Sequence, residues 1–448
     1  MPPIIPSSQQ FDQPTLGKLI DTDAVVQRYR RLFALFDWTA LDPPAKPSSP
    51  GRPAHPPSAY VKALLVRIGE HLSSTPRWRT YLQDHPRLLL ELGFRPHLDV
   101  SEPYGFRVSK TVPSVRHLNA ILRSLDPGLL AELFAQSVHA LQAEIPGLGE
   151  VVAYDVKHIY ANVKENNPRV YVKDRFCKER QPKGDPDCRV GVKRSTNQEQ
   201  PDGSTKEVKE YLWGYGSGVA AATSPDYGDV VMAENTLTFK QADVTYYRPL
   251  YLRTVVTLDQ FPIHVTADAA FDYWYVYETV AHGSGIGAIA LNSHGHEHVP
   301  RDPDGTPYCS AGLRMHPTYQ FDHTNGYRAQ RFRCPLLFPE RTGQTCQHEQ
   351  FAKGKGCVKD CNIEAGGLMR ALLDREGPLY KAVYTQRTCC ERINSQAKDF
   401  GIERPKARNI RSIRRLNTLI YITINAKALQ RARTINASLL TPKLGKVA

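Results

Sequence analysis

The sequence has no apolar run of the roughly 18 residues that a membrane-spanning helix needs. Its first residues, MPPIIPSSQQFDQ, lack the charged start and apolar centre of a secretory signal. Acidic residues are outnumbered, with 45 Asp and Glu against 58 Lys and Arg, and the formal net charge is +13. We therefore expect a cytoplasmic protein without a membrane segment, whose partner is a polyanion, most commonly nucleic acid.

The sequence also lacks the two close cysteine pairs of a standard zinc knuckle. Of its nine cysteines, Cys334, Cys346, Cys357 and Cys361 follow the spacing C-x11-C-x10-C-x3-C within 293–366, a segment that is also rich in histidine. Two interpretations of this Cys/His-rich insertion stay open: a structural zinc site at these four residues, or unligated thiols among surface histidines. In a reducing compartment disulfides are less favoured than either.

Residues 1–147 have the pattern of a mostly helical N-terminal domain. Apolar residues recur at helical spacing, for example at Tyr60 and Leu64. Asp126 is a good N-cap and Pro127 suits the first helical position, so we expect a helix to begin there. Lysines and arginines are scattered through this domain. The sequence leaves open whether it binds DNA or only packs against the rest of the chain.

Residues 148–292 predict an α/β domain. The segment 151–163 is rich in β-branched and aromatic residues, which is typical of a strand, and Asp155 lies within it. The alternating segment FPIHVTA ends at Asp268 and a helical pattern follows, an arrangement that places sites at strand ends in open α/β sheets. A polar, basic insertion, 163–208, lies between the two. A buried carboxylate is costly unless it is paired or bound to a cation, whereas a strand-end aspartate facing solvent needs no partner.

The segment YTQRTCCERINSQAKDF begins at Tyr384 and carries an unusual polar stripe. Arg387, Glu391 and Lys398 follow Tyr384 at offsets of 3, 7 and 14, which fall on one face of a helix. A surface helix with a packing role has apolar residues at such offsets. The alternative is a solvated ion pair between Arg387 and Glu391, with a small effect on stability.

Residues 367–448 predict the C-terminal part of the same α/β domain. Residues 408–434 have the pattern of an amphipathic helix, with Arg411, Arg414 and Arg415 near its start. A basic face beside a catalytic helix would bind a DNA backbone. A merely solvated amphipathic helix is the alternative.

Three carboxylates could come together in this chain. Asp155 and Asp268 are close in space if their strands are neighbours, and Glu391 can reach them from the C-terminal helix. Three carboxylates in a dry cleft cannot all stay ionised unless a cation binds, and their hard oxygens suit Mg²⁺. Two such ions about 4 Å apart can activate a water or a 3′-hydroxyl and stabilise the leaving oxygen of a phosphodiester.

With the spacing of Tyr384, Arg387, Glu391 and Lys398, the chain matches the Y-(2)-R-(3)-E-(6)-K signature. It thereby resembles one large group of bacterial insertion-sequence transposases of the DDE class. VVAYDVKHIYAN is similar to the segment of the family's first aspartate, and VTADAAFD to that of the second. The chain departs from the family at Val156, where Gly or a Ser- or Thr-like residue is usual. The resemblance covers most of the chain and is weakest in the two insertions.

The resemblance implies an RNase H-like catalytic core, a mixed five-stranded sheet flanked by helices. The three carboxylates would be catalytic ligands of Mg²⁺ or Mn²⁺, Arg387 and Lys398 would contact phosphates at the transposon end, and Tyr384 would support DNA binding. The implied reactions are hydrolytic nicking at the element ends and strand transfer into target DNA. The implied partners are double-stranded DNA, as terminal inverted repeats and as target, and a second copy of the chain, at a bacterial nucleoid.

Three other functions remain open from the sequence. A metal-dependent nuclease of the same fold would cut DNA without joining it. A domesticated or decayed protein would bind DNA without catalysis. A zinc-dependent DNA-binding protein would have the cysteine region as its centre.

Overall fold

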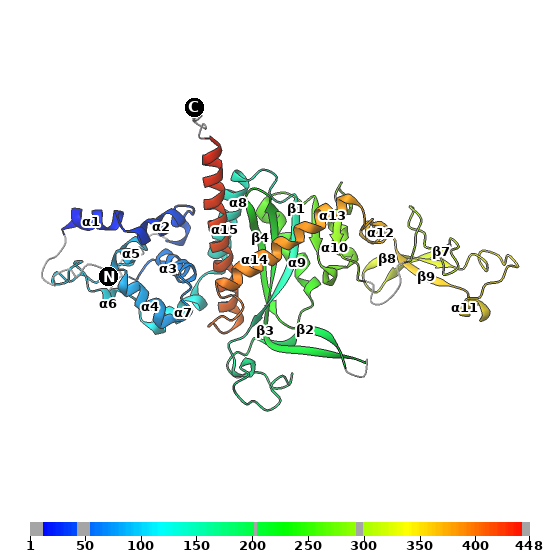
Figure 1. The fold of residues 1–448 in the computed structure, drawn as a ribbon, viewed down its shortest axis with the longest axis horizontal. Coiled ribbons are helices and arrows are strands. Elements are labelled where there is room, and N and C mark those ends of the chain that lie inside the picture. Colours follow the sequence, from blue (N-terminus) through cyan, green and yellow to red (C-terminus); the bar gives the residue numbers. More distant parts are fainter. Residues whose placement is uncertain (1–11, 43–53, 201–203, 293–298, 441–448) are drawn as a thin grey trace.

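The structure is a computed structural model that describes residues 12–42, 54–200, 204–292 and 299–440. Figure 1 shows the N-terminal helices at one end, a sheet with helices around it in the centre, and a small sheet at the other end. The long helix α15, Ile410–Leu440, stands between the N-terminal helices and the central sheet.

Eight α-helices precede the first strand in the described part of the chain. They are α1 Gln13–Asp21, α2 Ala24–Phe33, α3 Pro57–Gly69, α4 Thr75–Asp84, α5 Pro86–Glu91, α6 Val108–Thr111, α7 Val115–Ser124 and α8 Pro127–Glu144. The Asp126 side chain accepts a hydrogen bond from the Gly128 N–H, which confirms the predicted start of α8. Leu64 and Trp78 are fully buried and belong to the same continuous core as the central sheet.

Six strands form the central sheet among the described residues. They are β1 Val151–Tyr160, β2 Arg189–Glu199, β3 Thr205–Ser224, β4 Gly228–Thr238, β5 His264–Ala267 and β6 Gly287–Ile289. Five of them lie side by side in the order β4, β3, β1, β5, β6. β1 is antiparallel to β3 and parallel to β5, so the sheet is mixed. Helices α9, Tyr247–Leu258, and α10, Trp274–Ala281, precede and follow β5 and make its connections.

The basic insertion, 163–208, is not an irregular loop throughout, because it contains β2 and the start of β3. β2 and the first half of β3 form an antiparallel ribbon that starts where Arg189 pairs with Gly214. The ribbon begins where β4 ends, because Thr238 of β4 pairs with Tyr215, the next residue of β3. β2 therefore continues the edge of the sheet, and Figure 1 shows the ribbon projecting away from it.

Successive residues of β1 face different helical layers. The Tyr154 ring packs against Tyr247 of α9, with ring centroids 4.8 Å apart. The next side chain, Asp155, accepts a hydrogen bond from Asn394 of α14, Thr388–Asp399. Because side chains alternate along a strand, α9 covers one face of the sheet and α14 covers the other.

Glycines in β3 allow a close approach on the α9 side. A Cβ atom at Gly216 or Gly218 would lie 2.2 Å or 2.6 Å from the side chain of Tyr246. The bulge between β3 and β4 lies elsewhere, between Ala220 and Ala221. The glycine-rich pattern of this strand therefore reflects the packing of an aromatic ring.

Helix α15 connects the N-terminal helices to the sheet through a buried amide. The Asn425 side chain accepts a hydrogen bond from the Val231 N–H at 2.9 Å and donates one to the Val231 carbonyl at 2.8 Å. Its amide nitrogen also donates to Ser137 of α8 at 3.1 Å. Asn425 thus makes the hydrogen bonds to β4 that a neighbouring strand would make, and it joins β4 to α15 and α8.

The Cys/His-rich insertion forms a separate three-stranded antiparallel sheet. Its strands are β7 His316–His323, β8 Tyr327–Arg333 and β9 Val358–Asn362, and the short helix α11, Glu349–Ala352, precedes β9. Helices α12, Ala365–Leu372, and α13, Pro378–Tyr384, lead back to the central domain. Arg370 of α12 makes two hydrogen bonds, of 2.8 and 2.6 Å, to the buried carboxylate of Asp272.

The predicted α/β class, with a mixed sheet flanked by helices, is confirmed. Among the residues that the structure describes, no helix is both long enough and apolar enough to span a bilayer.

We predict that Asn425→Ala lowers the free energy of unfolding by on the order of 3 kcal/mol, because it leaves the buried N–H and carbonyl of Val231 without partners. Urea denaturation followed by circular dichroism measures the change. Ser438→Ala, at an exposed position of the same helix, is the matched control and should change the value by less than about 0.5 kcal/mol. Equal stability of the two variants would contradict the role given to Asn425.

Candidate active site

Asp155 and Asp268 lie side by side where β5 ends. Tyr154 of β1 pairs with Ala267, the last residue of β5, and Asp155 and Asp268 are the residues that directly follow this pair. Asp268 also caps a short turn, η4 Ala269–Phe271, by accepting a hydrogen bond from the Ala270 N–H at 2.9 Å. Two aspartates distant in sequence thus come together because β1 and β5 are neighbours.

Glu391 approaches the same strands from α14. Tyr384 ends α13 and Arg387 ends a 3-10 turn, η5 Thr385–Arg387, so the predicted stripe lies on two helices joined by this turn rather than on one helix. Cys389 and Cys390 are buried on the inner side of α14, where they pack behind Glu391. Glu391 itself lies on the exposed side of the helix, with 55% of its side chain accessible.

The negative charges of the other two acids affect the pKa of the Asp155 carboxyl. Burial raises the pKa of Asp155 to about 6, and the negative charges of Asp268 and Glu391 add to the rise. A hydrogen bond from the Val156 N–H and the positive charge of Arg387 oppose it. The structure therefore brings Asp268 and Glu391 within electrostatic reach of Asp155.

Asn394 is a site residue that the sequence analysis missed. It lies three residues after Glu391 on the buried side of α14, and its amide nitrogen donates to the Asp155 Oδ2 at 2.8 Å. Its Oδ1 is buried and has no hydrogen-bond partner among the described residues. The sequence could have indicated Asn394, because it is a polar residue at a position on the inner face of the helix that apolar residues normally occupy.

Asp243 is a fourth carboxylate beside the predicted three. It begins the 3-10 turn η3, Asp243–Tyr246, which contacts both β1 and η4. Burial raises the pKa of Asp243 to about 7, with contributions from the charges of Asp268 and Asp155. Its sequence context, QADVTYY, is that of an ordinary turn before a helix, so no periodicity marks it.

The cations of the signature have partners within the chain. Arg387 pairs with Glu391 at 2.8 Å, and its guanidinium lies 5.7 Å from the ring centroid of Tyr384. Lys398 is 62% exposed and lies 3.8 Å from Glu403, which also pairs with Lys157 at 3.7 Å. The ion pair that the sequence offered as an alternative is thus present, beside the acids.

The predicted DNA-binding arginines at the start of α15 are arranged differently. Arg411 is exposed, whereas Arg414 donates to the Thr236 carbonyl at 2.9 Å and Arg415 donates to the Arg123 carbonyl at 2.8 Å. Arg414 and Arg415 thereby join α15 to β4 and to the end of α7. β4 is two strands away from β1 and its Asp155.

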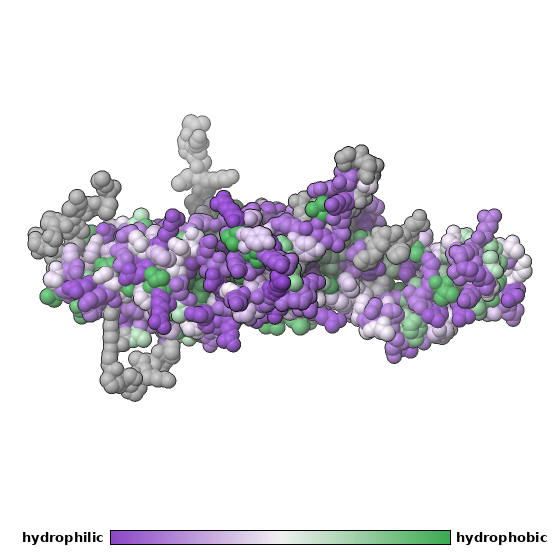
Figure 2. Space-filling model, turned by 90° about the horizontal axis from the view of Figure 1, so that it is seen from below, coloured by the Kyte–Doolittle hydropathy of each residue, from purple (hydrophilic) through white to green (hydrophobic). Residues whose placement is uncertain are grey.

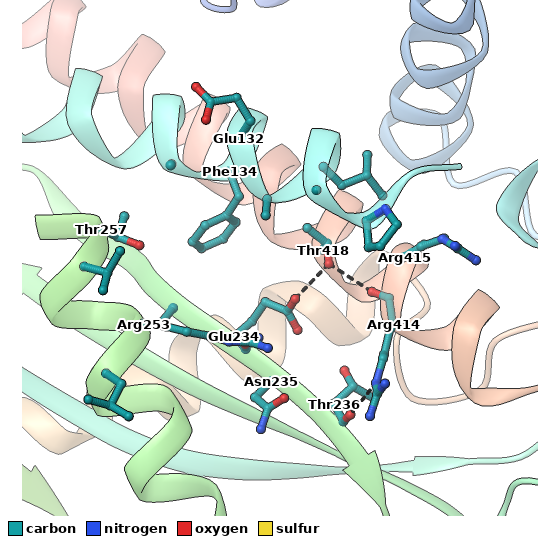
Figure 3. Close-up of a pocket in the computed structure, with 18 residues that line it drawn as sticks. Glu132, Phe134, Glu234, Asn235, Thr236, Arg253, Thr257, Arg414, Arg415 and Thr418 are labelled. Carbon is teal, nitrogen blue, oxygen red and sulfur yellow. Dashed lines mark hydrogen bonds between the residues drawn. The ribbon is translucent and has the colours of Figure 1, made fainter. Parts of the chain in front are cut away.

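Arg414 and Arg415 line a cavity of about 720 Å³ between α8, α9, β4 and α15. Figure 3 shows Glu234 in this cavity, where one carboxylate oxygen accepts a hydrogen bond from Thr418 at 2.8 Å. The other oxygen is buried and has no partner among the described residues, and burial raises the pKa of Glu234. None of the four carboxylates Asp155, Asp243, Asp268 and Glu391 lines this cavity.

The predicted zinc residues do not surround a common point. Cys357 and Cys361 lie in a small apolar cluster with Cys309, Cys334 packs against Gly356, and Cys346 is half-buried. Burial raises the pKa of Cys357 and of Cys361. Within the described ranges, no three His, Cys, Asp or Glu side chains are arranged to hold a metal ion.

Neither models of known protein families nor curated protein sequences match this chain. The chemistry of the site therefore rests on its own residues. Buried carboxylates with raised pKa values, gathered at the end of a strand, can exchange protons near neutral pH or bind a divalent cation.

The raised pKa of Asp155 predicts a pH dependence of stability in metal-free protein. Between pH 4 and pH 6 the folded protein retains a proton that the unfolded chain has released, so the free energy of unfolding falls as the pH rises through this window. Asp155→Asn should remove the part of this loss that comes from Asp155, leaving the part that comes from Asp243, and should be more stable than the parent at pH 8 by roughly 3 kcal/mol.

Urea denaturation in buffer that contains EDTA, at about pH 4.5 and about pH 8, measures the free energy of unfolding at the two ends of this window. Asp226→Asn, at an exposed position, is the control and should follow the parent at both pH values. A parallel loss of stability in the parent and in Asp155→Asn would contradict the assignment to Asp155.

Proposed function

We propose that the chain is a metal-dependent DNA transposase of the DDE class, which cleaves DNA at the ends of its element and joins them to target DNA. The observation that carries the proposal is that Asp268, the residue after β5, and Glu391 of α14 both lie within electrostatic reach of Asp155 on β1. Two further features support it: the four-residue signature around Glu391 and the net charge of +13.

The architecture is consistent with the proposed RNase H-like core. Five of the six strands of the mixed sheet lie in the order β4, β3, β1, β5, β6, with α9 and α14 on opposite faces. The first acid lies on the central strand and the second follows its parallel neighbour. The third lies on a helix over the same strand.

The donor set fits Mg²⁺ or Mn²⁺ in its chemistry. The oxygens of Asp155 and Asp268 are hard ligands on adjacent strands, and the buried, unpartnered Oδ1 of Asn394 adds a neutral oxygen beside them. The three acids are not gathered into a metal site in the described structure, and Glu391, which pairs with Arg387, has to release this partner to join the two aspartates. A bound divalent cation would activate the attacking oxygen and stabilise the leaving oxygen of the phosphodiester.

The chain's own residues have distinct tasks in this proposal. Asn394 fixes the orientation of the Asp155 carboxylate by donating to its Oδ2. Arg387 and Lys398 flank Glu391 along the helix and would contact DNA phosphates, because a guanidinium and an ammonium bind phosphate well. Tyr384 stacks on Tyr380 with ring centroids 5.3 Å apart and holds its ring beneath Arg387.

We predict that Asp155→Ala, Asp268→Ala and Glu391→Ala each abolish cleavage of duplex DNA that carries the terminal repeats flanking the coding sequence, in the presence of Mg²⁺. Each variant should bind the same DNA with an affinity near that of the parent, because the basic surface is retained. Product analysis on denaturing gels detects cleavage, and joining of a labelled end to a plasmid detects strand transfer.

Exposed Asp226→Ala is the matched control and should retain both activities. Full activity in any of the three variants would remove that residue from the catalytic set. Cleavage without joining in the parent would identify a nuclease, and DNA binding without cleavage would identify a binding protein; either result would refute the transposase proposal.

A further inference from the structure

The two faces of the β7–β8–β9 sheet have different environments. Phe332 of β8 and Cys361 of β9 are buried in a small apolar cluster with Met315, Cys309 and Cys357. Side chains alternate along a strand, so the neighbours of Phe332 in β8 point to the opposite face. That opposite face carries aromatic rings, although rings usually lie on the side of a sheet that faces the core.

Three rings follow one another along β7. Tyr319, Phe321 and His323 are two residues apart, and their ring centroids are separated by 6.0 and 6.3 Å. Tyr327 of β8 pairs with His323, and the two rings are stacked with centroids 4.6 Å apart and planes 4° apart. Tyr319 is 48% exposed, so the row is accessible from solvent at its outer end. We call these four residues the ring row.

Arginines lie beside the ring row. The Arg331 guanidinium is 5.3 Å from the Tyr319 centroid and 5.5 Å from the Phe321 centroid. Asp360 holds it with hydrogen bonds of 2.7 and 2.8 Å, so its position does not depend on a ligand. Arg333, two residues further along the same strand, lies over Phe338 at 4.6 Å. Rings that alternate with fixed cations suit a partner that has both flat bases and phosphates.

The ring row leads towards the carboxylates. Tyr327 contacts Trp274, the first residue of α10, with ring centroids 5.8 Å apart. Trp274 lies six residues after Asp268, and its neighbour Tyr273 is 49% exposed. In Figure 2 the end of the molecule that holds this sheet shows apolar patches among hydrophilic side chains. Aromatic side chains therefore extend from the insertion to the start of α10, six residues after the second acid.

We propose that the ring row binds unpaired nucleotides of a DNA strand, whose bases stack on Tyr319 and Phe321 while Arg331 and Arg333 contact the phosphates. The inference rests on the proposed function, because a strand that is cleaved and moved near Asp268 has nucleotides without partners. Stacking requires exposed base faces, so the ring row should discriminate single-stranded from double-stranded DNA.

The test uses the full chain in EDTA, so that no cleavage occurs. Fluorescence anisotropy measures binding of a labelled single-stranded oligonucleotide of mixed sequence and, separately, of its duplex. We expect the double variant Tyr319→Ala/Phe321→Ala to bind the single strand roughly tenfold more weakly or worse, and the duplex as the parent does. The aromatic exchange Tyr319→Phe/Phe321→Tyr should retain single-strand binding, which shows that the sheet still folds.

Two controls separate this inference from the catalytic proposal. Tyr171→Ala, at a 89% exposed tyrosine in the basic insertion, should leave single-strand binding unchanged. Asp226→Ala, at an exposed position outside both sites, should also bind the single strand as the parent does, and because the assay contains EDTA its outcome does not depend on whether Glu391 is catalytic. Unchanged single-strand binding by the alanine double variant, an equal loss for both DNA forms, or no single-strand binding by the parent would each overturn the inference, the last in favour of a protein partner.

Discussion

The constraint on which the site depends is the burial of a carboxylate in the middle of a sheet. Asp155 lies on the central strand, beneath α14, with Asp268 beside it and Asp243 close by. Such a cluster is costly in water-free surroundings, and the structure offsets only part of the cost through Asn394 and a backbone N–H. Because the fold keeps these acids together without neutralising them, they bind protons or cations. This tendency is the basis of the chemistry proposed for the site.

The surrounding elements make this arrangement possible. β5 ends at Ala267, so no residue of β5 pairs with β1 beyond Tyr154. The turns η3 and η4 occupy the space beside β1 at this point. Helix α14 is held over the strand from its other side by buried cysteines, and by Arg392, which makes hydrogen bonds of 2.8 and 2.6 Å to Asp229 of β4. The position of Glu391 is therefore set by contacts that lie outside the group of acids.

The sequence predicted those parts of the site that depend on local pattern. Asp268 was visible because an alternating strand ends at it, and Glu391 because a polar stripe replaced an apolar one. Asp243 was not visible, since its role depends on a turn that packs on β1 and η4, which no periodicity encodes. The continuous helix from Tyr384 to Lys398 was interrupted by a 3-10 turn. The strand β2 was hidden because its polar composition resembles that of a loop, and only its pairing with β3 makes it a strand.

A buried ion pair between Arg370 and Asp272 connects the insertion to the carboxylates. Asp272 lies four residues after Asp268, and its buried carboxylate accepts hydrogen bonds from Arg370, Tyr277 and the Asn292 N–H. Arg370 belongs to α12, which follows the last strand of the insertion, so this ion pair fixes the exit of the insertion against the segment that carries the second acid. Breaking a buried pair of this kind leaves a charge without compensation. The geometry between the insertion and the acids is therefore set by a strong polar contact, and a DNA strand held on the insertion would be presented to the carboxylates at a defined place.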